Sequence, residues 1–122
     1  MANDFKRFTV NNVNTSAGAS ASAVYTVPAG AGSTALESIV IGITVSNTST
    51  SGITASVFLD NYSGSNDAYI VKDASIPAGA SLEVMAGNKI VVQNDGTTGD
   101  VLRVSASAAT SADVIVSVLE DV

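Results

Sequence analysis

The stretch LESIVIGITVS (36–46) carries an aliphatic residue at every second position from Ile39 onward, and most of the residues between them are small or polar. Ile39, Ile41, Ile43 and Val45 recur at every second position. A period of two is typical of a β-strand with one buried face, because successive side chains point to opposite sides of the backbone. We therefore predict a strand here, with these four aliphatic side chains on the face that packs into the core.

The same period recurs along the rest of the chain. β-Branched residues dominate these runs, as is usual in pleated, packed sheets. The runs therefore predict further half-buried strands. Their aliphatic positions are Ile53, Ala55, Val57 and Leu59 in one run, Leu102, Val104, Ala106 and Ala108 in a second, and Val114, Val116 and Val118 in a third.

Polar segments rich in Asn, Asp, Ser and Gly separate the runs. SNTSTSG (46–52) is predicted to be the loop of a hairpin, and NDGTTGD (94–100) carries the tight-turn dipeptide Asp-Gly. DNYSGSND (60–67) is a longer polar loop. The spacing of about eight to twelve residues per strand predicts seven to nine short strands. We expect residues 1–122 to form one all-β domain, an antiparallel β-sandwich that is jelly-roll-like.

One short step occurs twice, as VPAG (27–30) and IPAG (76–79). Proline suits a strand end because it lacks the backbone N–H, and glycine accepts the positive φ that a Cβ would penalise. Leu-Glu follows a few residues later in both copies, so we predict equivalent structural corners of a two-sheet fold. MAGNK (85–89) predicts one more turn, which would join 80–86 and 89–94 as a hairpin. The residues expected to shape these corners and turns are Pro28, Gly30, Pro77, Gly79 and Gly87.

The composition limits the kinds of function. Charged residues make up only 13% of the chain and the net charge is −6, with the five basic residues scattered. Without a basic stripe, direct nucleic-acid binding is not expected. The segment MANDFKRF (1–8) lacks the apolar region of a signal peptide, and no apolar run is long enough to span a bilayer. We expect synthesis in a cytoplasm and no membrane partner.

The chain has no histidine and no cysteine. The commonest general base is therefore missing, and with it the commonest nucleophile pair, as are disulfides and cysteine-based metal sites. Two loops, 60–67 and 94–100, carry enough oxygen ligands to suggest calcium, but neither matches a known calcium-loop spacing. Asp and Asn in such loops usually bond to their own backbone. We predict no enzyme activity, no metal and no cofactor.

Two groups of residues are candidates for contact with a partner. Residues 1–12 form either a first strand or an N-terminal arm laid on a neighbour. Loop 60–67 holds the tyrosine most expected to be exposed, since the other tyrosines fall within strand patterns and aromatic rings dominate small cores. The candidate contacts are Phe5, Lys6, Arg7 and Phe8 in the first segment, and Asp60, Tyr62 and Asp67 in the loop.

An ordered set of segments covering about residues 24–121 resembles small virion structural proteins of tailed bacteriophages. It carries the repeated aliphatic-Pro-Ala-Gly step, the strands that follow each copy and a Gly-Asp-led C-terminal pair of strands. The segments are YTVPAG (25–30), ESIVIGITVSNTSTSGITASVFLD (37–60), AYIVKDASIPAGASLEVMAGNKIVVQ (68–93) and GDVLRVSASAATSADVIVSVLED (99–121).

The resemblance implies a β-sandwich present in many copies on the outer surface of a phage particle. It implies a capsid decoration, or cement, protein that binds the major capsid protein and copies of itself, as a homotrimer or another symmetric homo-oligomer. A head–tail neck, collar or tail component is the alternative within this class. A receptor- or glycan-binding module using loop 60–67 is the alternative of another class. The family supplies no catalytic residues.

Overall fold

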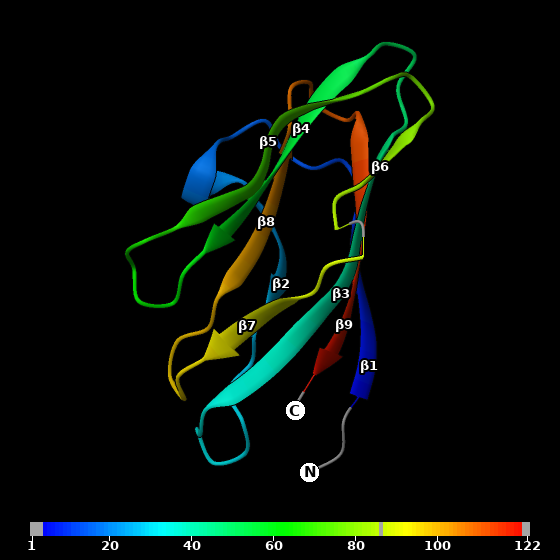
Figure 1. Cartoon of the computed structure of the whole chain (residues 1–122). Coiled ribbons are helices and arrows are strands. Elements are labelled where there is room, and N and C mark those ends of the chain that lie inside the picture. Colours follow the sequence, from blue (N-terminus) through cyan, green and yellow to red (C-terminus); the bar gives the residue numbers. More distant parts are fainter. Residues whose placement is uncertain (1–3, 86, 121–122) are drawn as a thin grey trace.

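A computed structural model describes residues 4–85 and 87–120 (Figure 1). These residues form two antiparallel sheets packed face to face, which confirms the predicted all-β sandwich. The nine strands found among them agree with the expected seven to nine. They are β1 (Asp4–Val10), β2 (Ser22–Thr26), β3 (Leu36–Asn47), β4 (Ile53–Asp60), β5 (Ala68–Ile76), β6 (Ser81–Glu83), β7 (Ile90–Asn94), β8 (Val101–Ala106) and β9 (Ala112–Glu120), with a short 3₁₀ helix η1 (Gly18–Ser20).

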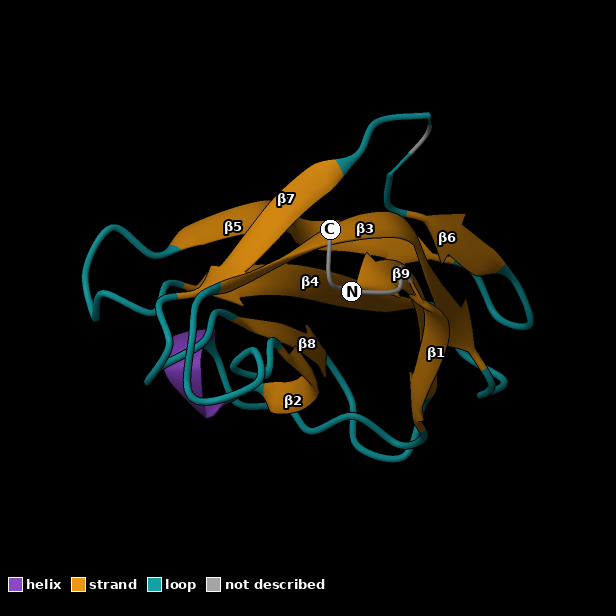
Figure 2. Cartoon of the chain, turned by 90° about the horizontal axis from the view of Figure 1, so that it is seen from below, coloured by secondary structure: helices purple, strands orange, loops and turns teal. Residues whose placement is uncertain are grey.

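The strand order is that of a jelly roll when β6 and β7 are counted as one edge position. The five-stranded sheet runs β1-β9-β3, and both β6 and β7 pair with the remaining edge of β3. The four-stranded sheet runs β2-β8-β4-β5. Apart from β4 to β5 and β6 to β7, every connection passes from one sheet to the other, and Figure 2 shows the two resulting layers.

Both hairpins predicted from turn signals are wrong. The loop at 46–52 joins β3 to β4, which belong to different sheets, so this loop crosses the sandwich edge. β6 and β7 do not pair with each other: β6 lies beside Thr44–Ser46 and β7 beside Leu36–Val40. Both short strands therefore pair with the same edge of the long strand β3, each with a different part of it.

The core lies between the sheets and contains most of the predicted aliphatic positions. Val57, Val104 and Val116 are fully buried, as their alternation predicted. Ala108 is an exception, because it lies in the loop after β8.

In β3 the predicted inward face is wrong for two of the four aliphatic residues. A β-bulge between Val40 and Gly42 shifts the alternation, since a bulge inserts one extra residue on one strand. Val40 and Ile43 therefore point into the core, whereas Ile39 and Ile41 face outward.

The two Pro-Ala-Gly steps occupy the same kind of connection, each leading from the four-stranded to the five-stranded sheet. In both, the aliphatic residue before proline is fully buried and its carbonyl accepts a hydrogen bond from an asparagine at a strand end. Asn94 Nδ2 donates to Val27 O at 2.8 Å, and Asn47 Nδ2 donates to Ile76 O at 3.0 Å. The Oδ1 atom of each asparagine also accepts the N–H two residues later. These buried amides therefore hold both corners to the sheet they approach.

The glycines of the two steps are required for different reasons. Gly79 has the predicted positive φ of 72°, and Gly87 in the later turn has a φ of 84°. Gly30 does not have a positive φ; a Cβ there would lie 2.6 Å from Thr34 Oγ1. At Gly30 the constraint is close packing of the chain on itself, not backbone conformation.

Candidate functional site: the outer face of the five-stranded sheet

Residues 4–10 of the predicted N-terminal contact segment form β1, an edge strand paired with β9 along its full length. Residues 1–3 lie outside the described residues. Because side chains alternate along a strand, the four candidate contacts point to opposite sides of β1. Phe5, 79% exposed, and Arg7 point outward, whereas Lys6 donates to the buried Glu120 and Phe8 stacks on Tyr25.

Phe5 ends a row of apolar side chains that crosses the whole sheet. Phe5 lies opposite Leu119, Leu119 opposite Ile39, and Ile39 opposite Val91. Directly opposite side chains on one face lie within contact distance of one another. The row therefore joins β1, β9, β3 and β7 as one continuous apolar stripe on the outward side.

Two more exposed aliphatic residues extend this surface. Ile41, displaced outward by the β3 bulge, lies on the same face, and so does Ile115, 47% exposed, on β9. Among the described residues, four of the five exposed large apolar side chains lie here, and the fifth is Tyr69. We call this outward surface the A face; its apolar members are Phe5, Ile39, Ile41, Val91, Ile115 and Leu119.

The charged residues of the A face, Arg7, Glu37, Glu83 and Asp113, lie outside the apolar row. The row next to the apolar one pairs Arg7 with Ser117 and Ser117 with Gly42, so its side chains are mostly small. Thr44 donates to Glu83 at 3.2 Å at the β6 edge. Small and hydroxyl-bearing groups lose little conformational entropy when another protein covers them. This surface can therefore bury apolar area against a partner at low cost.

A buried polar network on the inner side of the A face holds β1 in place. Glu120 accepts hydrogen bonds from Lys6 Nζ and from the Tyr25 hydroxyl, both at 2.7 Å, and the Tyr25 hydroxyl also lies 2.8 Å from Ser38 Oγ. The hydrogen bond to Glu120 raises the pKa of the Lys6 ammonium, and the negative charge of Glu120 adds a smaller effect in the same direction. Burial raises the pKa of the Tyr25 phenol. The network links β1, β9 and β3 of one sheet to β2 of the other.

The loop candidates have local structural partners. Asp60 bonds Arg103 Nε at 3.0 Å, and Asp67 Oδ1 accepts the Asn61 N–H at 2.7 Å. Tyr62 is half-buried, and its N–H donates to Asp100. The most exposed tyrosine is Tyr69, at 38%, so the expectation that Tyr62 was the exposed ring is wrong.

The carboxylates of loop 94–100 accept backbone N–H groups, some from the loop itself and some from neighbouring segments. Asp95 Oδ1 accepts the N–H groups of Thr97 and Thr98, and these backbone bonds lower the pKa of Asp95. Asp100 accepts N–H groups from Gln93 and Tyr62. Within residues 4–85 and 87–120, no three acidic side chains gather as a metal site.

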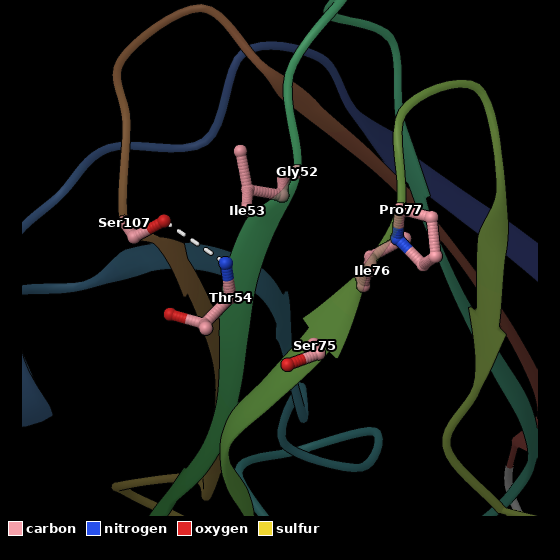
Figure 3. A pocket seen from close by; sticks show the side chains of 7 residues that line it. All are labelled: Gly52, Ile53, Thr54, Ser75, Ile76, Pro77 and Ser107. Carbon is pink, nitrogen blue, oxygen red and sulfur yellow. Dashed lines mark hydrogen bonds between the residues drawn. The ribbon is translucent and has the colours of Figure 1, made fainter.

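A hollow of about 360 Å³ lies beside the second corner, where the ends of β4 and β5 meet the loop after β8 (Figure 3). Ile53, Ile76 and Pro77 supply apolar walls, and the Thr54 N–H donates to Ser107 Oγ at 2.9 Å. None of its lining residues is titratable. The hollow therefore offers shape and hydroxyl groups, with no acid or base for catalysis.

No protein-family model matches the chain, and a search of curated proteins finds no significantly similar sequence. The sandwich fold is therefore what the structure shows, and the resemblance to phage virion proteins stays a prediction. Among the described residues, no helix is long and apolar enough to cross a bilayer.

The sequence predicted only one end of the A face, through Phe5 and Arg7. The alternation predicts that Ile39 and Ile41 lie in the core, and it does not mark Val91, Ile115 and Leu119 as exposed. Gly42 was the available signal, because an isolated glycine within a strand pattern often marks a bulge.

Proposed function

We propose that this chain is a non-enzymatic structural protein of a tailed-bacteriophage particle, a capsid decoration protein that binds the lattice of the major capsid protein through its A face. The observation that carries the proposal is the apolar row from Phe5 to Val91 across an exposed sheet. Contiguous exposed apolar surface on a folded domain is characteristic of protein–protein contact.

Two further features support this function. Jelly rolls recur in viral capsid domains, although the same fold also serves other functions, so the fold alone carries little weight. The net charge of −6 favours solubility and disfavours contact with packaged nucleic acid. Both suit a protein on the outside of a particle, bound there in many copies and as a symmetric homo-oligomer.

The test uses particles of the encoding phage from which this protein has been removed. Adding the purified chain back should restore hundreds of copies per particle and raise the temperature at which the particles rupture. Val91→Asp and Phe5→Asp should abolish rebinding, because they place a carboxylate within the apolar row. Ala23→Asp on β2, exposed on the other sheet, is the matched control and should rebind normally.

Three results would count against the proposal. Particles without the protein that rupture at the unchanged temperature would remove the stabilising role. Normal rebinding of both A-face variants would remove the A face as the contact. A stoichiometry of a single ring per particle would instead favour the neck, collar or tail alternative.

A further inference from the structure

A small polar cavity lies on the outer face of the other sheet, remote from the A face. Its volume is about 140 Å³, the room of roughly five water molecules. Tyr69, Lys72 and Asp73 of β5 line it together with Ser56 of β4 and Ser105 of β8. Thr15 and Ala17, from the segment before η1, also contribute to its lining. We call this the β5 cavity.

Two bulges in β5 create this grouping. Between the pairs Ala55–Ala74 and Val57–Val71, β5 has one more residue than β4, and it gains another before Tyr69 pairs with Phe58. Lys72 and Asp73 therefore share the position opposite Ser56. Bulges of this kind redirect side chains, and they are frequent beside functional sites. Without them, strict alternation would not place all three side chains on the cavity side.

Asp73 also has an unfavourable backbone conformation. Its φ is +52°, in the left-handed region that favours glycine, although it lies within a strand. The Asp73 N–H donates to Ser56 Oγ at 2.9 Å, which helps to hold this geometry. Backbone positions strained in this way cluster at ligand sites. A surface strand has no packing need for an aspartate here, since its side chain is 68% exposed.

The groups around the cavity complement a neutral polyhydroxyl ligand. Lys72 Nζ lies 3.3 Å from Asp73 Oδ2 and 5.5 Å from the centre of the Tyr69 ring, so ammonium, carboxylate and ring converge. The carboxylate only accepts hydrogen bonds, the ammonium only donates, and the serine hydroxyls do both. Neighbouring hydroxyls of a sugar can satisfy all three, and its apolar C–H groups can pack on the tyrosine. The two charges cancel, so the site favours no ionic ligand.

We propose that the β5 cavity binds one pyranose ring of a glycan. The inference does not depend on the decoration function, because the cavity and the A face lie on different sheets. Phe58 supports the site from within β4: it packs edge-on against Tyr69, with ring centres 4.9 Å apart. A second copy or a capsid lattice bound at the A face would leave the cavity open to solvent.

The test is a titration of the isotope-labelled full chain followed by amide NMR. The probes are glucose, galactose, mannose, rhamnose, N-acetylglucosamine and N-acetylgalactosamine, each at millimolar concentration. At least one should give saturable shifts at residues 69–74 and at Ser56 and Ser105. Tyr69→Ala should weaken that binding at least tenfold. Tyr62→Ala, in the neighbouring loop, is the matched control and should bind as the unchanged chain does.

Asp73→Gly separates a ligand role from a structural one. Glycine relieves the positive φ, so this variant should melt at a higher temperature and yet lose sugar binding. The proposal is overturned if no probe gives saturable shifts, if the shifts map elsewhere, or if Asp73→Gly binds with unchanged affinity. Capsid rebinding by Asp73→Gly should stay normal, which keeps this result distinct from failure of the decoration function.

Discussion

Single residues at the corners are constrained by the backbone that approaches them. Gly99 lies against Val27, the buried residue that precedes the first corner proline, and a Cβ at Gly99 would overlap the Val27 carbonyl oxygen. That same carbonyl accepts the Asn94 amide. Gly99 is therefore required by close approach of two backbone segments, although its position in the polar loop 94–100 suggests only a turn.

Gly99→Ala should lower the free energy of unfolding by about 2–3 kcal/mol, because the corner or the loop must move to admit the methyl group. Gly42→Ala is the control, since a Cβ there meets no atom within 4 Å. Urea denaturation of both variants measures the difference. Equal stability of the two would show that the corner adapts freely.

Tyr25 connects the two sheets through its hydroxyl. Tyr25→Phe removes the bond to Glu120 and leaves that buried carboxylate short of one partner, so at pH 7 it should cost about 1–3 kcal/mol. Denaturation of the purified variant beside the unchanged chain checks this value. A loss below about 0.5 kcal/mol would mean that water replaces the phenol.

The same residue predicts alkaline sensitivity. The folded-state pKa of Tyr25 is raised above the ordinary value of 10.0, so the unfolded chain loses this proton first. The stability that this residue contributes is complete below pH 10 and is lost as the pH rises further. Lys6 acts in the same direction above its ordinary value of 10.5. Between about pH 10 and 12 the unchanged chain should lose stability more steeply than Tyr25→Phe; parallel curves would contradict this.

At the scale of elements, the two corners share one kind of contact as well as a sequence. Each brings a buried aliphatic-Pro step from the four-stranded sheet onto an asparagine that ends a strand of the other sheet. Asn47 bonds two carbonyls, those of Ser51 and Ile76, and its backbone bonds Ala80 and Gly79. The asparagine side chain thus supplies hydrogen bonds at the place where the chain turns and the pairing of strands ends.

Asn47→Asp should destabilise the domain by about 3 kcal/mol, because a carboxylate oxygen would replace the donor that faces two carbonyl oxygens. Asn61→Asp is the matched control: Asn61 Oδ1 accepts the Ser63 N–H, a role that aspartate keeps. Thermal and urea denaturation compare the two. A small effect at Asn47 would mean that the corner does not depend on its amide.

At the scale of the whole molecule, the sandwich presents two different outer surfaces. The A face is mostly apolar and small, and it is underlain by the Glu120 network. The opposite sheet carries the β5 cavity, with an ion pair and hydroxyl groups. The core separates these surfaces, so a partner bound to one of them would leave the other facing solvent.

Deletion of residues 1–11 tests whether the N-terminal segment is an integral strand of the sandwich or a separable arm. An arm would be removed without loss of stability. Because β1 covers Tyr25 with Phe8 and pairs with β9 throughout, deletion should cost about 3 kcal/mol or more and expose the β9 edge to aggregation. Circular dichroism melting and light scattering measure both effects. An unchanged melting temperature would favour the arm.

Nearby residues account for the local features of this protein. Alternation at Ile53–Leu59 and Val114–Val118 marked strands with the correct inner face, and the two Pro-Ala-Gly steps marked equivalent connections, because strand period and turn chemistry depend on nearby residues. Only the folded chain shows which strands pair, where the bulges fall and which side chains become exposed. Ile39, Ile41, Tyr69 and Asp73 acquired their positions from bulges opposite distant strands. Register is set by packing between segments far apart in the chain, and that packing has no local signature.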